Sequence, residues 1–161
     1  MGDAYIVGAV RSAIGLGKPG RGALTLTRAD VHLANVLNGL VNQANVDPRT
    51  IDDVVAGCVT AIGEQGFNIA RMAVLEAGWP VEVTGTTVNR MCGSSQQAIH
   101  QAAHAIMAGQ ADVMIGCGIE LMSREPMGAD GMVGPNVWLP QPPEYKYEFQ
   151  VRPGTRRGSS R

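Results

Sequence analysis

The stretch that decides the fold runs from residue 83 to residue 109 and reads VTGTTVNRMCGSSQQAIHQAAHAIMAG. Its first part, Val83 to Met91, is rich in threonine and valine, which is typical of a β-strand. Its second part, Gly93 to Ala108, is expected to be a helix that stops at Gly109. The stretch therefore predicts a strand that passes into a helix at Cys92.

The same alternation of strand and helix extends along most of the chain. We expect the other strands at residues 5–10, 53–59 and 112–119, and the other helices at residues 27–45 and 67–77. Four strands alternating with three helices indicate an α/β fold with crossover connections.

The pattern stops near residue 123, which suggests three parts. We expect an α/β domain over residues 1–122 and the start of a loop region over residues 123–150. Residues 151–161 carry four arginines and no acidic residue. We expect this tail to be disordered.

The composition narrows the class of protein. The chain has 161 residues, 45% of them hydrophobic, which is enough for one domain with a core and too apolar for a disordered chain. The net charge of −1 gives no basic field for nucleic acid or an anionic membrane. No apolar run reaches the length of about 18 residues that a spanning helix needs, and the N-terminus lacks the features of a secretory signal.

The cysteines point to a reducing compartment. The three cysteines are Cys58, Cys92 and Cys117, and their spacing fits neither a Cys-x-x-Cys metal pair nor a disulfide scaffold. We therefore expect reduced thiols, a cytoplasmic location and no metal site. Cys58 and Cys117 lie inside expected strands among apolar residues, so we interpret them as structural.

The helix that follows Cys92 carries no charge. No Asp, Glu, Lys or Arg occurs from Met91 to Ala111. A surface helix normally places charges on its solvated face. We therefore expect this helix to be enclosed on most sides, by something more than one four-stranded sheet.

Cys92 itself has two interpretations. At the start of a helix, exposed N–H groups and the helix dipole stabilise a thiolate, which is the setting of an activated nucleophile. Gly93 permits a close turn, Ser94 and Ser95 can cap the helix, and the Cys92 N–H can serve as an oxyanion donor. The alternative is a small buried cysteine, the common fate of this residue type.

A family resemblance favours the nucleophile. The run from Val88 to Ile99, VNRMCGSSQQAI, resembles the acyl-enzyme cysteine motif of the thiolases, the acetyl-CoA acyltransferases. Residues 4–15, AYIVGAVRSAIG, resemble the first strand and turn of that family, and residues 116–123, GCGIELMS, resemble its fourth strand and the run that follows. The match covers about residues 4–150 in the right order. Gln96 departs from the small or aliphatic residue of many members.

The resemblance implies an activity and a fold. Thiolases cleave 3-ketoacyl-CoA or condense acetyl-CoA, with an acyl group held as a cysteine thioester, so Cys92 is implied as the nucleophile. Coenzyme A is then a substrate, and no cofactor is implied. The implied fold is the N-terminal half of an αβαβα sandwich, βαβαβαβ with a mixed sheet, with the second half missing. That second half would cover the uncharged helix.

Three motifs of the family do not occur in the sequence. These are the Gly-His-Pro histidine, the Cys-x-Gly acid/base and the Asn-Glu-Ala-Phe segment. His100 and His104 lie about 12 and 18 Å along the helix from Cys92, and His32 has no motif around it. We interpret all three histidines as structural or solvated. The chain is therefore expected to be a truncated thiolase with little activity alone, and a shifted reading frame is one hypothesis for its tail.

Two alternatives remain. One is a non-catalytic half-domain that pairs with itself or with a full thiolase. The other is a fragment of a ketoacyl-synthase-type condensing enzyme, whose usual His-His or His-Asn partners are also absent. For the thiolase reading we expect acyl-CoA or coenzyme A as ligand, with a homo-oligomer or association through the exposed half-domain surface, and neither nucleic acid nor membrane as partner.

Overall fold

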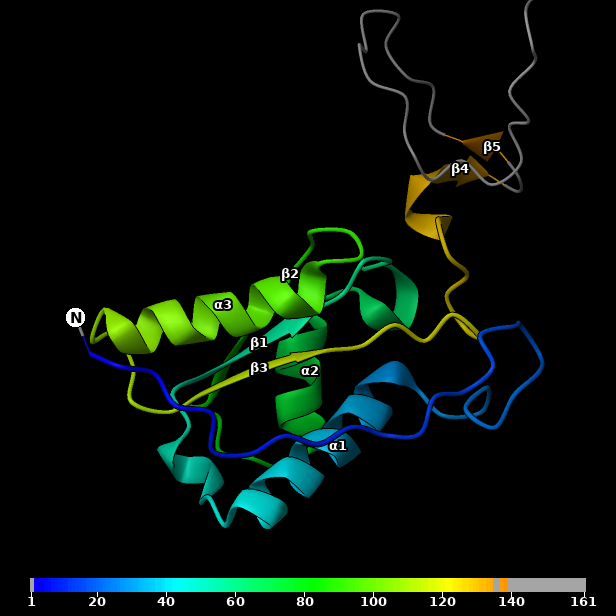
Figure 1. Ribbon diagram of the computed structural model, residues 1–161. Helices are drawn as coiled ribbons and strands as arrows, with labels where there is room; N and C mark the ends of the chain where they lie inside the picture. Colours follow the sequence, from blue (N-terminus) through cyan, green and yellow to red (C-terminus); the bar gives the residue numbers. More distant parts are fainter. Residues whose placement is uncertain (1, 135–136, 139–161) are drawn as a thin grey trace, which may run out of the picture. The chain divides into compact units, whose positions relative to one another are not determined.

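A small parallel sheet forms the centre of the protein. The computed structural model describes residues 2–134 and 137–138 (Figure 1). In this part of the chain the sheet has three strands, in the order β2-β1-β3: β1 (Asp53–Gly57), β2 (Thr84–Val88) and β3 (Met114–Gly118). All pairs are parallel, with Val55 opposite Thr86 on one side and Gly116 on the other. The three strands therefore end at one edge, where the candidate site lies.

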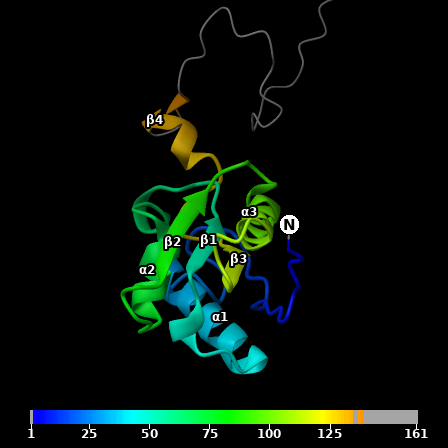
Figure 2. The same ribbon diagram turned by 90° about the vertical axis from the view of Figure 1, so that its left-hand side faces the viewer.

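Helices cover both faces of this sheet. Figure 2 shows the helix α3 (Ser94–Met107) on one face and the helices α1 (Ala29–Ala44) and α2 (Ile69–Glu76) on the other. Short 3-10 turns occupy Pro48–Thr50, Gly63–Gln65 and Ala129–Gly131. A separate antiparallel pair joins β4 (Met132–Gly134) to β5 (Val137–Trp138).

The apolar core lies between the sheet and the α1/α2 layer. Alternate residues of a strand face opposite sides, so one face of β1 supplies Val54 and Ala56, which are both fully buried. They pack in one cluster with Leu33 and Leu37 of α1 and with Ile69 of α2. Most of the buried aliphatic side chains thus lie on this one side of the sheet.

The other face of the sheet is built for a close approach of α3. A Cβ atom at Gly57 would lie 2.3 Å from the Ser95 amide nitrogen, and one at Gly116 would lie 2.7 Å from the Ile99 Cα. A Cβ at Gly118 would overlap the Ser95 side chain. Only glycine leaves room for the helix backbone at these strand positions.

The element ends follow local signals in the sequence. Asn68 caps α2, where its side chain accepts a hydrogen bond from the Arg71 N–H. Gly78 and Gly109 follow α2 and α3 with positive φ angles of 75° and 70°, so the expected glycine stops are confirmed. Asn45 ends α1 in the left-handed conformation.

The expected α/β class and three of the four expected strands are confirmed, but the strand at residues 5–10 is wrong. That segment pairs with no strand in the described part of the chain, and Tyr5, Ile6 and Val7 are all more than 70% exposed. Without a hydrogen-bonded neighbour or apolar burial, its β-type pattern has no stabilising partner. The mixed sheet is also a correction, because the pairs within the described three-stranded sheet are parallel.

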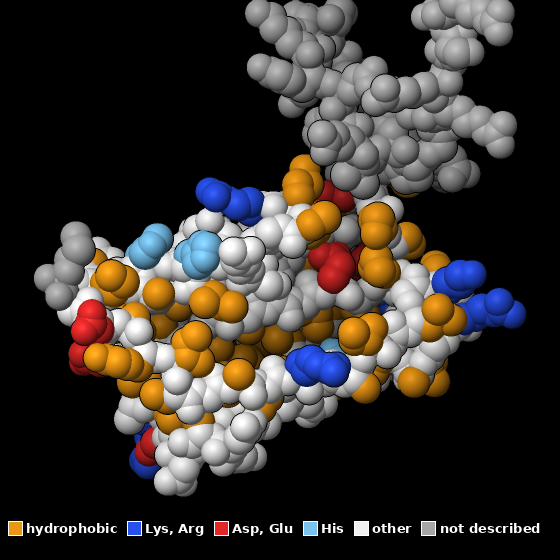
Figure 3. All heavy atoms as spheres, in the orientation of Figure 1, with side chains coloured by type: hydrophobic (Ala, Val, Ile, Leu, Met, Phe, Trp, Pro, Cys, Tyr) orange, Lys and Arg blue, Asp and Glu red, His pale blue; other side chains and the backbone are white. Residues whose placement is uncertain are grey.

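An apolar cavity accompanies the unpaired N-terminal segment. It has a volume of about 780 Å³ and lies between residues 4–17, the outer edge of β3 and the helices α1 and α3. Figure 3 shows apolar side chains gathered in a hollow band along this face. The backbone of β3 is therefore left with one edge that no strand covers among the described residues.

The expected boundaries after residues 122 and 150 stay predictions. The compact unit that contains the three-stranded sheet extends to Asp130, and the expected boundary after residue 122 lies inside it. The short strands β4 and β5 fall in the expected loop region of residues 123–150. The expected disordered tail, residues 151–161, lies outside the described residues.

Replacing Gly57 by alanine tests the close approach of α3. We expect Gly57→Ala to lower the free energy of unfolding by about 1–3 kcal/mol, because the new methyl group would overlap the helix backbone. Urea denaturation measures this change. The matched control is Gly39→Ala on the exposed side of α1, where nothing lies within 4 Å. That change should instead stabilise the protein by about 0.5–1 kcal/mol, and equal effects of the two substitutions would contradict the packing described.

Candidate active site

Three loops meet at the carboxyl edge of the parallel sheet. Cys58 to Thr60 follow β1, Asn89 to Cys92 follow β2, and Ile119 to Leu121 follow β3. The carboxyl ends of parallel strands are the usual place for ligand sites in open α/β sheets. The sequence-predicted nucleophile, Cys92, lies in the second of these loops.

Cys92 is exposed and lies two residues before α3 begins. The residue before it, Met91, has a φ of +49°, the left-handed region that L-residues seldom adopt. The expectation of a cysteine between strand and helix is confirmed, whereas the alternative of a buried Cys92 is wrong for this chain.

The serines after Cys92 act differently from the expected caps. Gly93 holds the N-cap position of α3, and no side-chain hydrogen bond caps it within the described residues. Ser94 instead bonds backwards, where its Oγ donates to the Met91 carbonyl and accepts from the Arg90 N–H at 2.9 Å. The Ser94 side chain therefore stabilises the loop that holds Arg90 and Met91, and it does not cap the N-terminus of α3.

A carboxylate ties the loops after β1 and β3 together. Glu120 accepts hydrogen bonds from the Val59 N–H at 2.8 Å and the Thr60 N–H at 3.2 Å. The fully buried Gln65 adds a third at 2.9 Å, and its amide also bonds to the Thr60 carbonyl. Sequence reasoning missed Glu120 and Gln65 as site-forming residues. The position of Glu120, just past a strand end, is the signal that could have identified it.

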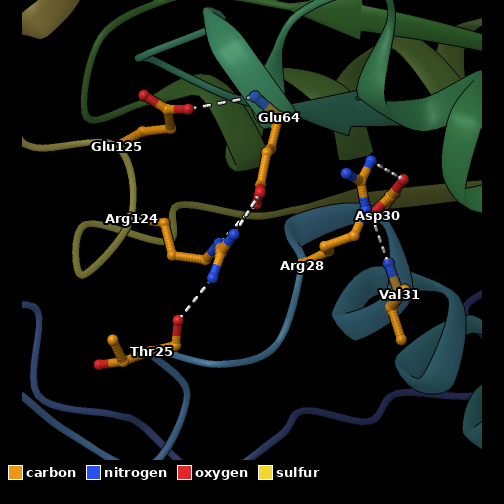
Figure 4. A network of polar contacts seen from close by, with 7 residues as sticks. All are labelled: Thr25, Arg28, Asp30, Val31, Glu64, Arg124 and Glu125. Carbon is orange, nitrogen blue, oxygen red and sulfur yellow. Dashed lines mark hydrogen bonds and ion pairs between the residues drawn. The ribbon is translucent and has the colours of Figure 1, made fainter. Parts of the chain in front are cut away.

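A second polar network fixes the chain that leaves the site. Figure 4 shows Arg124 between the side chain of Glu64 and the carbonyl of Thr25, with Nε 2.6 Å from the Glu64 carboxylate and Nη1 2.6 Å from the carbonyl oxygen. The hydrogen bond from Arg124 holds the pKa of Glu64 below its ordinary value. Glu125 accepts from the Glu64 N–H at 3.1 Å. The segment after β3 is thereby held to the loop that follows β1.

The other two cysteines are structural, as expected. Cys58 is buried in the core, and Cys117 is partly buried within β3. Burial raises the pKa of Cys58 to about 12, with a smaller contribution from the charge of Glu120. Burial alone raises the pKa of Cys117 to about 12. Both thiols therefore stay protonated at neutral pH and are poor nucleophiles.

The histidines do not contact Cys92 through any hydrogen bond in the described part of the chain. His32 shares a 2.9 Å hydrogen bond with Ser12. His100 and His104 are exposed and lie beside each other on α3, with ring centroids 6.4 Å apart (Figure 3). The interpretation of these residues as structural or solvated agrees with these positions.

In the part of the chain that the structure describes, the uncharged helix α3 is buried on the side that faces the sheet. Ser94, Ala98 and Ala102 are the buried residues of α3, and they face the sheet. The outer side of α3 is exposed, with Ile99 46% exposed and most of the neutral polar residues exposed, which agrees with the expectation that the cover of this side would come from the second half of the sandwich. Among the described residues the sheet is the layer that packs against α3, and the outer side of the helix is exposed.

The described residues offer no cluster of three metal-ligating side chains. None of their helices has both the length and the apolar character that crossing a membrane requires.

Comparison with known proteins identifies the family. Residues 4–147 match the family model of the thiolase N-terminal domain. The chain belongs to the thiolase family. The match covers most of the chain and includes all three motif segments that suggested it.

The relatives that this chain matches extend well beyond it. It is 43% identical over 154 residues to a steroid 3-ketoacyl-CoA thiolase of Mycobacterium tuberculosis, covering 96% of this chain and 37% of the relative. It is 47% identical over 128 residues to a 3-ketoacyl-CoA thiolase of Aliivibrio salmonicida, covering 79% of this chain and 33% of the relative. The chain therefore spans about a third of the length of the relatives it matches.

A solved structure supports the fold. The crystal structure of an acetyl-CoA acetyltransferase from Bacillus anthracis superimposes with a TM-score of 0.63 at 37% identity, covering 68% of this chain and 27% of the other. The thiolase-type α/β arrangement of the sheet and its helices is thus shown for the N-terminal part of that fold.

Selective alkylation tests the different environments of the three cysteines. We expect iodoacetamide at pH 8 to modify Cys92 in the native chain and to modify Cys58 and Cys117 only after denaturation. Peptide mass mapping measures this. Labelling of Cys58 as fast as Cys92 in the folded chain would contradict the assigned burial.

The raised pKa values of Cys58 and Cys117 make the free energy of unfolding depend on pH in the alkaline range. In the unfolded chain a thiol titrates near about 8.5, whereas the folded pKa of Cys58 and of Cys117 is raised to about 12. Between these values the unfolded state loses protons that the folded state keeps, so stability is full below the lower value and falls as pH rises. Urea denaturation at a series of pH values measures this fall. A free energy of unfolding that stays constant from pH 9 to 11 would contradict the prediction.

Proposed function

We propose that the chain carries the acyl-accepting cysteine of a thiolase-type acyltransferase, with Cys92 as the nucleophile. The observation that supports this most directly is the exposed thiol in the loop before α3, within a motif that fits the family to which the chain belongs. The names of the relatives point to 3-ketoacyl-CoA or acetyl-CoA as the substrate class.

The proposed half-reaction is a thioester exchange. The Cys92 sulfur, as thiolate, attacks the carbonyl carbon of an acyl-CoA and forms a carbon–sulfur bond, and the carbonyl electrons move onto oxygen. The tetrahedral oxyanion collapses, the bond to the coenzyme A sulfur breaks, and coenzyme A leaves as its thiolate. Amide groups at the start of α3, including the Cys92 N–H, are suited to stabilise the oxyanion.

The full thiolase cycle needs groups that this sequence does not contain. A base must take the thiol proton, and an acid/base must act on the substrate α-carbon; the family motifs for both roles are absent from the 161 residues. We therefore propose that this chain by itself forms the acyl thioester slowly and does not turn over 3-ketoacyl-CoA at a rate typical of the family. The compartment we propose remains the cytoplasm.

Acyl transfer to Cys92 tests the proposal. Incubation with acetyl-CoA should add about 42 Da to the peptide that contains Cys92, because one acetyl group replaces one proton. Cys58 and Cys117 serve as internal controls because their protonated, covered thiols should gain nothing. Cys92→Ser should abolish the adduct. An unmodified Cys92 after long incubation, or rapid cleavage of a 3-ketoacyl-CoA by the chain alone, would overturn the proposal.

Association is a second proposed property, favoured by the exposed neutral face of α3. The half-exposed Ile99 and the edge of β3, which no described strand covers, are surfaces that favour association, and the α3 face carries no charge that would oppose it. We propose that this half-domain surface mediates self-association. This property is shared with the non-catalytic alternative, which predicts association without an acyl adduct.

Sedimentation velocity tests the association. We expect the chain to sediment as a dimer or larger species, and we expect Gln101→Glu on the exposed face of α3 to shift it towards monomer, because two copies would bring like charges together. Glu76→Gln, a charge change on α2 on the opposite side of the sheet, is the control and should leave the distribution unchanged. A monomer at all concentrations would exclude self-association.

A further inference from the structure

The residue before Cys92 has a backbone conformation that its own side chain disfavours. Met91 has a φ of +49°, and a long side chain is rarely found in this region. Such a conformation persists only where surrounding contacts over-determine it. The contacts that hold Met91 therefore also decide where the next residue points.

Two polar side chains bind the two ends of Met91. The Met91 N–H donates to Oδ1 of Asn89 at 2.9 Å. The Met91 carbonyl accepts from the Ser94 Oγ and from the Ser94 N–H, the latter at 3.0 Å. Both hydrogen-bonding groups of the strained residue are thus held by its neighbours.

Asn89 also anchors this turn to the adjacent loop. Its Nδ2 donates to the Val59 carbonyl at 2.9 Å, and the Val59 N–H donates in turn to the Glu120 carboxylate at 2.8 Å. The side chain of Asn89 is exposed, yet both ends of its amide are engaged. The turn is therefore fixed relative to the ends of all three strands.

We propose that Asn89 and Ser94 are positioning residues, which keep Met91 left-handed and thereby set the direction of the Cys92 thiol. The inference deepens the proposed function and rests on it for its biological meaning. Asn89 acts through Met91 and is not itself assigned contact with a substrate.

A comparison of two reagents separates positioning from simple stability. Phenyl thioacetate transfers its acetyl group to a thiolate through a tetrahedral oxyanion and releases thiophenolate, so it responds to the direction of the sulfur relative to nearby amides. Iodoacetamide alkylates the same sulfur with loss of iodide and forms no oxyanion. The ratio of the two rate constants at Cys92 therefore reports orientation, independently of recognition of coenzyme A.

We expect Asn89→Ala to lower this ratio by at least about tenfold, because the Met91 N–H loses its acceptor. Asn89→Ser should keep most of it, since a serine hydroxyl can accept the same N–H. The double variant Asn89→Ala/Met91→Gly should recover to within about threefold of Met91→Gly, because glycine adopts a positive φ freely. The comparison of the double variant with Met91→Gly tests the positioning role even if Asn89→Ala alone does not fold.

Asn68→Ala is the matched control. Asn68 is, like Asn89, an exposed asparagine whose side chain makes several hydrogen bonds: it caps α2 and bonds to the Gly85 carbonyl and the Thr87 hydroxyl of β2, but to none of residues 89–94 in the described part of the chain. Its loss should lower the urea midpoint without changing the ratio. A ratio unaltered by Asn89→Ala, an equal fall in Asn68→Ala, or no recovery in the double variant would overturn the inference. Failure of acetyl-CoA to acylate the unaltered chain would instead contradict the proposed function and leave this ratio readable.

Discussion

The close approach of α3 to the sheet is the constraint on which the rest of the structure depends. Gly57, Gly116 and Gly118 carry no side chain on the face where the helix lies, so the backbone of Ser94 and Ser95 can rest directly against β1. Any larger residue would lift the helix and move its first turn away from the strand ends. Because Cys92 lies two residues before that turn, these glycines help to set where the thiol lies.

The polar groups around the strand ends complete this placement. Glu120 connects the loop after β3 to the loop after β1, and Asn89 connects that loop to the turn before Cys92. These bonds join segments about sixty and thirty residues apart in sequence. A rigid support of this kind is what a nucleophile needs, because small displacements of a reacting atom are costly to the rate. The thiol is presented to solvent, while the two other cysteines are kept protonated by burial.

Much of the fold could be predicted from local patterns, because the helices and three strands have strong spacing and clear ends. Gly78 and Gly109 stop their helices as expected, and Cys92 lies between strand and helix. The strand at residues 5–10 could not be judged this way, since strand formation depends on a neighbour that the local sequence does not specify. The layer that would cover the outer side of α3 is likewise not specified by the sequence of the helix. A charge-free face indicates that a partner is favoured, but not whether the same chain supplies it.

The position of the proposed nucleophile could be predicted from the sequence, whereas the residues that support it could not. Cys92 was identifiable from its place and from the motif around it, whereas Glu120 and Gln65 meet only in three dimensions. Hydrogen bonds between distant loops leave no periodic signal in the sequence. The left-handed conformation of Met91 was equally hidden, because methionine carries no local preference for it.

A crystal structure of the chain would show directly whether α3 lies against the sheet in this way. We expect it to show the Ser94–Ser95 backbone packed on Gly57, Met91 with a positive φ near 49°, and the Cys92 sulfur open to solvent at the carboxyl edge of the sheet. A helix that begins elsewhere, or that is separated from Gly57 by an intervening layer of side chains, would contradict it.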